Sequence, residues 1–396
     1  MQNDFYGEPL TQLYRSPRER LLQQYVANSS LKSLKIEMQG PSPPNIFVGR
    51  VGYPEVYVGP LLGADESINA ELYDDPRKWY GLPLEEIVKF RSTLVRGKKL
   101  SNIKNRELYE LQDSVLSKKS VDMEVKFRKA PSMNVYFHNV FQPMGPTAEY
   151  EKMRLTSNPS VPKKVDSLIY EDVTARTAFS ELMRADFDVY YLQKLLSGGL
   201  LGRQQSKKLV PTRWSITAAD RIAADIHIEK LKNCKEVQEI QLYQNEYLAN
   251  HFEVLLLPGK WEFEQFENWE AHGHYRQNKE WFLEHEYEPY EGRSDYAESE
   301  GGGYYAGRFS VAEFLAEKLR RQARVVVIRE IKKEYDIPVG VWEIRENVKH
   351  AFENPPEKFS TLEQAKTALR ERLRNPPELY FGRSAILPQR KIRDFY

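Results

Sequence analysis

One interior stretch, residues 207–221, holds the residue types that contact phosphate. In it, Arg213 and Trp214 follow a proline and lie just before a helix predicted over 222–231. A guanidinium can hold a phosphate with two parallel hydrogen bonds, amides at a helix N-terminus attract anions, and an indole offers a face for base stacking. The stretch therefore predicts a nucleic-acid or phosphate site made of Lys207, Lys208, Thr212, Arg213, Trp214 and Ser215.

A purely structural interpretation of the same stretch stays open. The hydroxyl of Thr212 or Ser215 could cap the helix, and Arg213 could pair with an acid elsewhere in the fold. The residue types alone do not decide between the two interpretations.

Glycines near residue 50 add one more candidate. Residues 45–60 predict two short strands around a Gly-Tyr-Pro turn, because β-branched and aromatic residues favour strands and glycine permits a tight return. A backbone could approach a phosphate beside Gly49, so Arg50 joins the candidate phosphate-binding residues. A plain hairpin is the better interpretation, since the stretch contains neither Gly-x-Gly-x-x-Gly nor Gly-Lys-Ser.

Two other clusters could bind ions. The histidines His272, His274 and His285 could ligate a metal, but the His-Glu-x-x-His spacing of a helical zinc site is missing, so we predict no metal and no cofactor. A basic run includes Arg320, Arg321, Arg324, Arg329, Lys332 and Lys333. It could contact phosphates in a salt-dependent way, or it could be a solvated helix face with acidic neighbours.

The end of the chain has the spacing of a docking peptide. Ile392 and Phe395 are three residues apart, so in a single 3₁₀ turn their side chains lie on one side, with Tyr396 beside them. Exposing such a turn is costly unless a partner's groove receives it. The alternative is a terminal strand folded onto the protein's own core.

This spacing resembles the PIP box, the peptide by which replication and repair proteins bind the sliding clamp PCNA. The resemblance places Gln389 in a small polar pocket of the clamp, Ile392 in the central apolar pocket, and Phe395 and Tyr396 beside it. Residues 384–388 would lie extended along the clamp, adding main-chain hydrogen bonds.

Composition limits what the rest of the chain can be. Of its 396 residues, 41% are hydrophobic, and 58 Lys and Arg face 57 Asp and Glu, so any nucleic-acid contact must come from a local patch. The single cysteine, Cys234, excludes an intramolecular disulfide. Without a signal sequence or an apolar run near the roughly twenty residues of a membrane span, we expect a cytoplasmic, nucleoid-associated protein that does not contact membranes.

The elements that must position these residues mix helices and strands. We predict helices at 83–91, 173–196 and 361–373, and strands at 133–137, 247–257 and 339–344. Residues 116–128 look like a helix end or an exposed connection, and 323–328 fit either a helix or a strand. Because no repeat and no regular βαβ alternation occurs, we expect an α+β fold of mixed helices and short sheets.

The length suggests more than one domain. We expect a helical segment at 1–40, an α+β domain at 41–285, a Glu- and Tyr-rich linker at 286–303, a second domain at 304–380, and a flexible tail at 381–396 with the clamp-binding residues.

Several short motifs stand out along the body of the chain: Phe47-Val48-Gly49-Arg50, Gly52-Tyr53-Pro54, Val58-Gly59-Pro60, Lys208 to Thr217, Pro338 to Trp342 and Arg345-Glu346-Asn347. In these motifs the chain resembles the archaeal Nre family of DNA-repair proteins. The resemblance implies DNA-damage repair with recruitment through PCNA, and Nre N-terminal-type and C-terminal-type domains at 41–285 and 304–380. Some members carry an N-terminal cysteine zinc motif, which this chain lacks, and the resemblance implies no reaction.

Three functions follow from these patterns. The first is a clamp-tethered repair factor that binds DNA through Arg213 and Trp214. The second is an enzyme acting on DNA or a nucleotide, with Asp220 or the histidines as catalyst. The third is an adaptor that bridges PCNA to another protein without contacting DNA. We favour the first.

Overall fold

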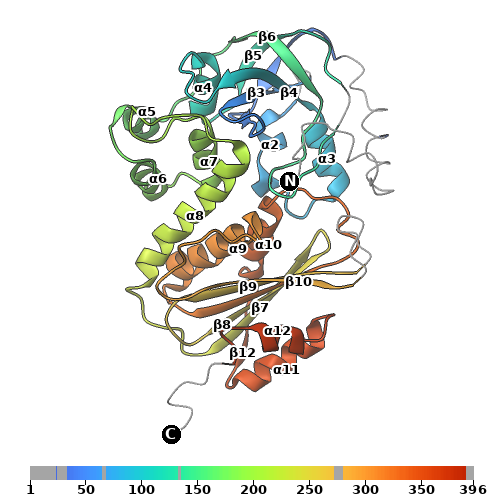
Figure 1. Cartoon of the computed structure of the whole chain (residues 1–396), viewed down its shortest axis with the longest axis vertical. Coiled ribbons are helices and arrows are strands. Elements are labelled where there is room, and N and C mark those ends of the chain that lie inside the picture. The colour runs from blue at the N-terminus through green and yellow to red at the C-terminus, as the bar shows by residue number, and fades with distance from the viewer. Residues whose placement is uncertain (1–23, 25–33, 65–67, 133–134, 272–279, 389–396) are drawn as a thin grey trace. The chain divides into compact units, whose positions relative to one another are not determined.

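A computed structural model describes residues 24, 34–64, 68–132, 135–271 and 280–388 (Figure 1). Contacts within the chain define two compact parts, residues 1–223 with 337–340 (unit 1) and residues 224–336 with 341–396 (unit 2). Each unit combines a six-stranded sheet with helices, which confirms the α+β fold with two domains. The domain boundaries predicted above stay a prediction.

The sheet of unit 1 has the strand order β1-β5-β6-β4-β3-β2. Its strands are β1 (Glu37–Ser42), β2 (Ile46–Val48), β3 (Glu55–Gly63), β4 (Leu94–Asn102), β5 (Val121–Phe127) and β6 (Thr147–Leu155). The pair β4–β6 is parallel and the other neighbours are antiparallel. The pairing of β2 with β3 confirms the hairpin predicted at 45–60. Residues 116–128, expected to be a helix end or an exposed connection, begin at the last residue of helix α4 (Tyr109–Leu116) and then form strand β5, whose alternate residues Val121, Met123, Val125 and Phe127 are buried.

The helical elements of unit 1 are α2 (Ala70–Tyr73), the 3₁₀ turn η2 (Pro76–Lys78), α3 (Leu84–Ser92), α4 (Tyr109–Leu116), α5 (Lys163–Tyr170), α6 (Ala175–Arg184), α7 (Val189–Ser197) and the start of α8 (Thr212–Leu231), which continues into unit 2. The helix predicted at 83–91 is confirmed as α3. The single helix predicted at 173–196 is wrong, because Asp186 adopts a left-handed conformation (φ 60°) and the Asp188 carboxylate caps a new helix, α7, by accepting from the amide of Tyr191. The strand predicted at 133–137 is also wrong for its described part, where Tyr136 forms an isolated bridge with Met144.

The sheet of unit 2 has the order β10-β9-β11-β8-β7-β12. Its strands are β7 (Ile240–Tyr247), β8 (Asn250–Leu257), β9 (Glu262–Trp269), β10 (Phe282–Glu288), β11 (Arg324–Ile331) and β12 (Glu357–Phe359). Strand β8 confirms the strand predicted at 247–257, and β11 shows that residues 323–328, which fitted either state, form a strand buried along its whole length. Strand β11 pairs parallel with β9 and antiparallel with β8.

Helices cover both faces of this second sheet (Figure 1). Helices α9 (Gly302–Glu313), continued by the π-helical turn η3 (Phe314–Leu319), and α10 (Trp342–Ala351) lie on one face, and α11 (Leu362–Arg372) and α12 (Glu378–Arg383) lie on the other. The helix predicted at 361–373 is confirmed as α11, with Thr361 and Gln364 forming a capping box. The strand predicted at 339–344 is wrong, because α10 begins at Trp342. Among the described residues, no helix is long and apolar enough to cross a membrane.

Candidate nucleic-acid site

In unit 1, the turn between β2 and β3 meets the first turn of α8. The amide of Val48 donates to the Thr212 hydroxyl at 2.9 Å. The rings of Tyr53 and Trp214 lie 5.3 Å apart between centroids, and the Lys208 amine contacts the Tyr53 hydroxyl at 3.3 Å. These contacts bring the segments 48–53 and 208–214 together into one surface, although they are more than a hundred and fifty residues apart in sequence.

Helix α8 begins at Thr212, earlier than the predicted start at 222, so Arg213 and Trp214 lie within its first turn. The amides of Trp214 and Ser215 both donate to the carbonyl of Pro211, at 2.8 and 2.9 Å. The Thr212 hydroxyl accepts from Val48, and the Ser215 hydroxyl donates to the carbonyl of Thr212 at 2.9 Å. In these bonds the Thr212 hydroxyl serves β2 and the Ser215 hydroxyl serves a carbonyl of its own helix.

Two guanidinium groups and an imidazole come together beside this helix end. Burial and the positive charge of Arg213 lower the pKa of Arg50. Burial, followed by the charges of Arg213 and Arg50, lowers the pKa of His138 to about 3. The charge of Arg213 thus acts on Arg50, and the charges of both arginines act on His138, which is neutral at physiological pH.

Aromatic packing fixes the orientation of His138, which the sequence did not single out. Its ring stacks on that of Phe141, with 4.1 Å between the centroids and 8° between the planes. Phe141 and Phe47 form an edge-to-face pair with their centroids 5.1 Å apart. The Nδ1 atom of His138 accepts from the amide of Val140 at 3.0 Å. In the neutral ring the proton is therefore on Nε2, which makes this atom a hydrogen-bond donor.

Gly340 supports the segment that carries His138. Its φ is +95°, and a Cβ built there would lie 2.7 Å from the carbonyl carbon of Phe141 and 3.0 Å from the amide nitrogen of Gln142. Only glycine combines this conformation with so close an approach of two backbones. Gly340, from the motif at 338–342, thus packs directly against the backbone of the segment that carries His138.

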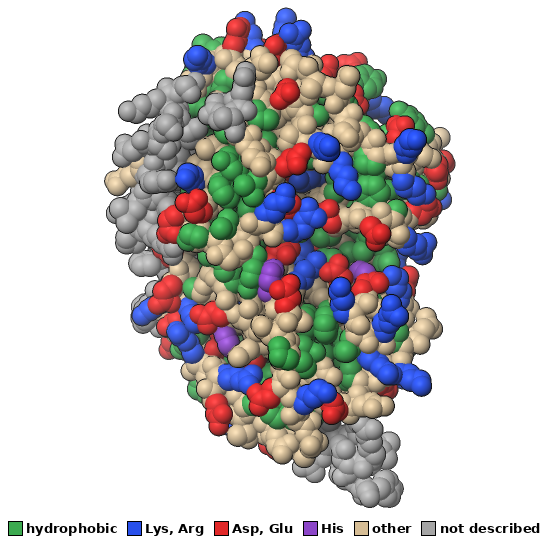
Figure 2. Space-filling model, turned by 180° about the vertical axis from the view of Figure 1, so that it is seen from behind, with side chains coloured by type: hydrophobic (Ala, Val, Ile, Leu, Met, Phe, Trp, Pro, Cys, Tyr) green, Lys and Arg blue, Asp and Glu red, His purple; other side chains and the backbone are tan. Residues whose placement is uncertain are grey.

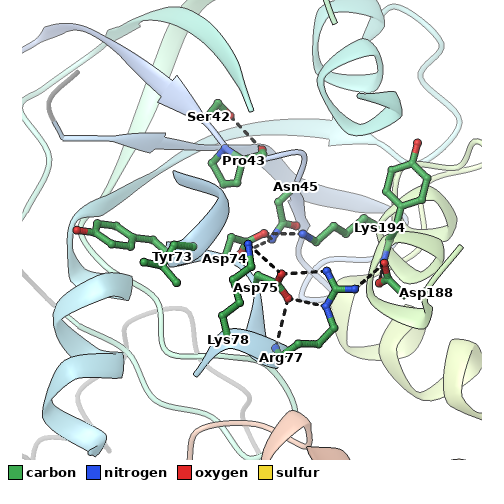
Figure 3. A network of polar contacts seen from close by, with 12 residues as sticks. Ser42, Pro43, Asn45, Tyr73, Asp74, Asp75, Arg77, Lys78, Asp188 and Lys194 are labelled. Atoms are coloured by element: carbon green, nitrogen blue, oxygen red, sulfur yellow. Dashed lines mark hydrogen bonds and ion pairs between the residues drawn. The ribbon is translucent and has the colours of Figure 1, made fainter. Parts of the chain in front are cut away.

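A buried ionic cluster around Asp74 anchors the start of the hairpin. Asp74 accepts from Asn45 at 2.8 Å and from Lys194 at 2.7 Å (Figure 3). It also accepts from Arg91 at 2.6 Å. Burial opposes ionisation of Asp74, but the charges of Lys194 and Arg91 lower the pKa of this carboxyl. Because Asn45 directly precedes β2, the cluster ties the start of the hairpin to α3 and α7.

The predicted phosphate-binding residues do not all share this surface. Arg50, Lys208, Arg213 and Trp214 meet there, whereas Thr212 and Ser215 are buried beneath it. The Lys207 amine donates to the carbonyl of Ile169 instead, and burial, followed by the charge of Arg106, lowers the pKa of Lys207.

The basic run at 320–333, in unit 2, differs from this surface because two of its arginines are buried. Arg324 and Arg329 lie on β11 and are buried, so they do not form a solvent-exposed phosphate face. Arg324 pairs with Glu262 at 3.2 Å, and Arg329 pairs with Glu267 at 2.9 Å and Glu343 at 3.4 Å.

The remaining candidates fall in unit 2 or outside the described residues. His285 pairs with Glu264 at 2.7 Å and stacks on Phe266. His272, His274 and the clamp-binding residues Gln389, Ile392, Phe395 and Tyr396 lie outside the described residues. In the part of the chain that is described, no group of three or more His, Cys, Asp or Glu is placed to hold a metal ion.

The segment before the tail corrects one expectation. Residues 384–388 were expected to lie extended along the clamp, but the Ser384 hydroxyl donates to Glu264 at 2.5 Å, and Ile386 and Leu387 are buried in the core of unit 2. Because its side chains already pack there, this segment is part of the folded unit, and a docking peptide would begin after Pro388.

Comparisons with known proteins agree along most of the chain. The model of the archaeal Nre N-terminal domain matches residues 15–276, and that of the Nre C-terminal domain matches residues 288–395. The chain is 40% identical to DNA repair protein NreA of Archaeoglobus fulgidus over 352 residues, which cover 87% of this chain and 88% of that protein. It is 34% identical to DNA repair protein NreB of the same organism over 335 residues, covering 84% of each chain.

A third relative is DNA repair protein NreA of Haloferax volcanii, 35% identical over 323 residues that cover 78% of this chain and 77% of that protein. No solved structure shows a significant match to the chain. Two family models that together span most of the sequence, and relatives aligned over more than two thirds of their length, show that this chain belongs to the archaeal Nre family.

Proposed function

We propose that this protein is a DNA-damage repair factor that contacts DNA phosphates through Arg50, Arg213 and His138. We further propose that residues Gln389, Ile392, Phe395 and Tyr396 recruit it to the sliding clamp PCNA. The relatives named as DNA repair proteins support the repair function. The observation that carries the DNA contact is the meeting of two guanidinium groups and one neutral imidazole at the start of α8.

The electrostatics favour an anion at this place. Two cations whose charges oppose each other are stabilised when a phosphate lies between them, and hydrogen bonds from guanidinium to phosphate are short and strong. The Nε2–H of His138 can donate to the same phosphate without first taking up a proton.

A local site is needed because the bulk charge is balanced. The formal net charge is +1, and on the face seen in Figure 2 the described Lys and Arg side chains are interspersed with Asp and Glu. Long-range attraction of the whole molecule to DNA is therefore weak, and affinity must come from a small number of phosphate contacts.

The geometry supports binding more than catalysis. In the tautomer that the Val140 amide selects, His138 has its Nε2 protonated and its Nδ1 occupied, so the ring has no open lone pair with which to act as a general base. Asp220, which the sequence offered as a catalyst alongside His272, His274 and His285, is fully buried on α8.

The DNA contact is tested by replacing Arg213 with alanine and measuring affinity for a fluorescein-labelled single-stranded oligonucleotide by anisotropy. Loss of a charge-assisted hydrogen bond is worth about 1.5–3 kcal/mol, so we expect affinity to fall by about 10- to 150-fold. The matched control is Arg154→Ala, which removes an exposed guanidinium of the same unit that pairs with Glu124 at 2.8 Å. Equal affinities for the wild type and Arg213→Ala would contradict this contact.

The clamp contact is tested separately by calorimetry. Purified PCNA is titrated with the full chain and with a chain ending at Pro388, which keeps the packed residues Ile386 and Leu387. We expect binding near micromolar, about −8 kcal/mol, that is lost on truncation and retained in Lys391→Ala, whose position the resemblance leaves outside the pockets. Clamp binding without any DNA affinity would indicate an adaptor instead.

A further inference from the structure

Two exposed aromatic side chains, Tyr53 and Trp214, lie next to Arg50 and Arg213. Tyr53 is 39% exposed and Trp214 is 44% exposed, whereas most large apolar side chains of unit 1 are buried. Their ring centroids are 5.3 Å apart and their planes are inclined by 53°. The two rings therefore present apolar faces to solvent beside Arg50 and Arg213.

Both rings are held by rigid supports. Tyr53 lies in a closed turn, in which the amide of Glu55 donates to the carbonyl of Gly52 at 2.9 Å and Gly52 has a φ of +82°. The amine of Lys208 contacts the Tyr53 hydroxyl and brings a further positive charge to the ring. Trp214 lies in the first turn of α8. Holding an aromatic pair in this way lowers the entropy lost when a third ring packs against it.

The form of DNA decides whether these rings can be used. Bases inside a duplex are stacked on their neighbours and show only their edges in the grooves, whereas an unpaired base has a face that can stack on an aromatic side chain. Stacking of this kind tolerates any base and strengthens binding by roughly five- to 150-fold per base.

We infer that this site takes an unpaired nucleotide of single-stranded DNA, with the base against Tyr53 and Trp214 and the adjoining phosphate toward Arg50 and Arg213. The inference rests on the proposed function, because it needs the phosphate contact as well as the stacking contact. It adds the kind of DNA that the site selects: an unpaired stretch in preference to an intact duplex.

The test separates stacking from charge. Anisotropy is measured with a labelled oligo-dT, with an oligonucleotide of the same length made of abasic residues, and with a blunt hairpin duplex. The wild type should bind oligo-dT at least five-fold more tightly than the abasic strand, which has the same phosphates, and more tightly than the duplex. Trp214→Ala should lose the preference for oligo-dT and keep its affinity for the abasic strand.

Two more variants complete the design. Tyr53→Leu should reduce the same preference, which keeps the inference testable if Trp214→Ala folds poorly. Tyr109→Ala removes an aromatic ring that is 67% exposed elsewhere in unit 1 and should leave the preference unchanged.

Failure of this inference differs from failure of the proposed function. Equal binding of oligo-dT and the abasic strand by the wild type, or tighter binding of the duplex, would overturn the unpaired-nucleotide preference and leave the phosphate contact standing. No binding to any of the three DNAs would overturn both. A preference for oligo-dT that survives in both Trp214→Ala and Tyr53→Leu would show that these rings are not the stacking surface.

Discussion

Arg213 in unit 1 and Arg329 in unit 2 both come from basic stretches of sequence, yet their surroundings differ. Arg213 acts on Arg50 and His138, and its charge contributes to lowering both of their pKa values. For Arg329, burial lowers the pKa, but the carboxylates of Glu267 and Glu343 raise it above its usual value. Arg213 thus acts on neighbouring groups that can carry positive charge, whereas Arg329 lies between buried carboxylates.

This difference shows what a basic run in a sequence can mean. A strand buried on both faces can hold arginines only if acids from neighbouring elements pair with them, and β11 obtains such acids from β9 and α10. The start of α8 is instead partly exposed, so Arg213 lies where an anion from solvent can approach it. Burial and the sign of the neighbouring charges, more than the count of basic residues, distinguish a structural ion pair from a binding site.

The largest effect on stability should come from breaking the buried ion pairs of Arg329 with Glu267 and Glu343. Arg329→Met leaves Glu267 and Glu343 buried without their cation, so we expect the free energy of unfolding to fall by about 3–5 kcal/mol. Urea denaturation measures this change. Arg213→Met, at a partly exposed position, should change stability by no more than about 0.5 kcal/mol. Similar losses in the two variants would contradict the distinction between them.

In unit 2, the carboxyl group of Glu300 is surrounded by other acidic side chains. Glu300 is buried, and burial together with the charges of Glu267, Glu286 and Glu284 raises its pKa well above the usual value. A raised carboxyl pKa gives stability that is present below the unfolded pKa, about 4.3, and is lost as pH rises toward the folded pKa, at about 1.4 kcal/mol per pH unit.

Glu300→Gln removes this titration, so the variant should become more stable than the wild type as pH is raised from 5 to 8, and the difference should vanish near pH 4. Urea denaturation across this pH range measures it. Glu298→Gln, at an exposed neighbouring position, is the control and should follow the wild type. A constant difference between Glu300→Gln and the wild type at every pH would show that Glu300 is ionised in the folded protein.

Gly340→Ala should affect both stability and the site. The left-handed conformation and the short distances to Phe141 and Gln142 make alanine unfavourable by about 1–3 kcal/mol, and relief of the clash displaces the segment of His138. We expect weaker DNA binding, by several-fold. Gly81→Ala is a matched control, since Gly81 has a φ of +84° but nothing within 4 Å of a Cβ, so it should lose stability without losing affinity.

The smallest effect should come from the hydrogen bond that joins the two motifs. Thr212→Val removes the acceptor of the Val48 amide and should reduce stability by about 1 kcal/mol. DNA affinity should fall slightly as the hairpin loosens from α8. Thr212→Ser keeps the acceptor, and if it behaved like Thr212→Val, the hydrogen bond would not be the link.

Sequence reasoning singled out those members of the proposed site whose chemistry is local. Arg213, Trp214 and Arg50 are conspicuous because of their types and their neighbours in the chain. His138 was missed because its partners come from segments far away in sequence, and nothing near it indicates a cationic environment. Tyr53 was treated as part of a turn, since its exposure beside Trp214 exists only in the folded protein.

The fold errors have similar physical causes. Charged residues on the exposed face of β5 hid the alternation of Val121, Met123, Val125 and Phe127. The left-handed residue Asp186 gave no glycine signal for the break between α6 and α7. The β-favouring residues at 339–344 enter a helix, because the turn at Gly340 and the packing of Trp342 outweigh local propensity.

The most direct test of the central claim is the salt dependence of single-stranded DNA binding. The slope of log affinity against log salt is measured for the wild type, for Arg50→Gln with Arg213→Gln, and for Arg320→Gln with Arg321→Gln as the unit 2 control. Each lost phosphate contact should reduce the slope by about 0.7, so the first pair should lower it by roughly 1.4 and the control should leave it unchanged. An unchanged slope in the Arg50 and Arg213 variant, or an equal reduction in the control, would contradict a DNA-phosphate site in unit 1.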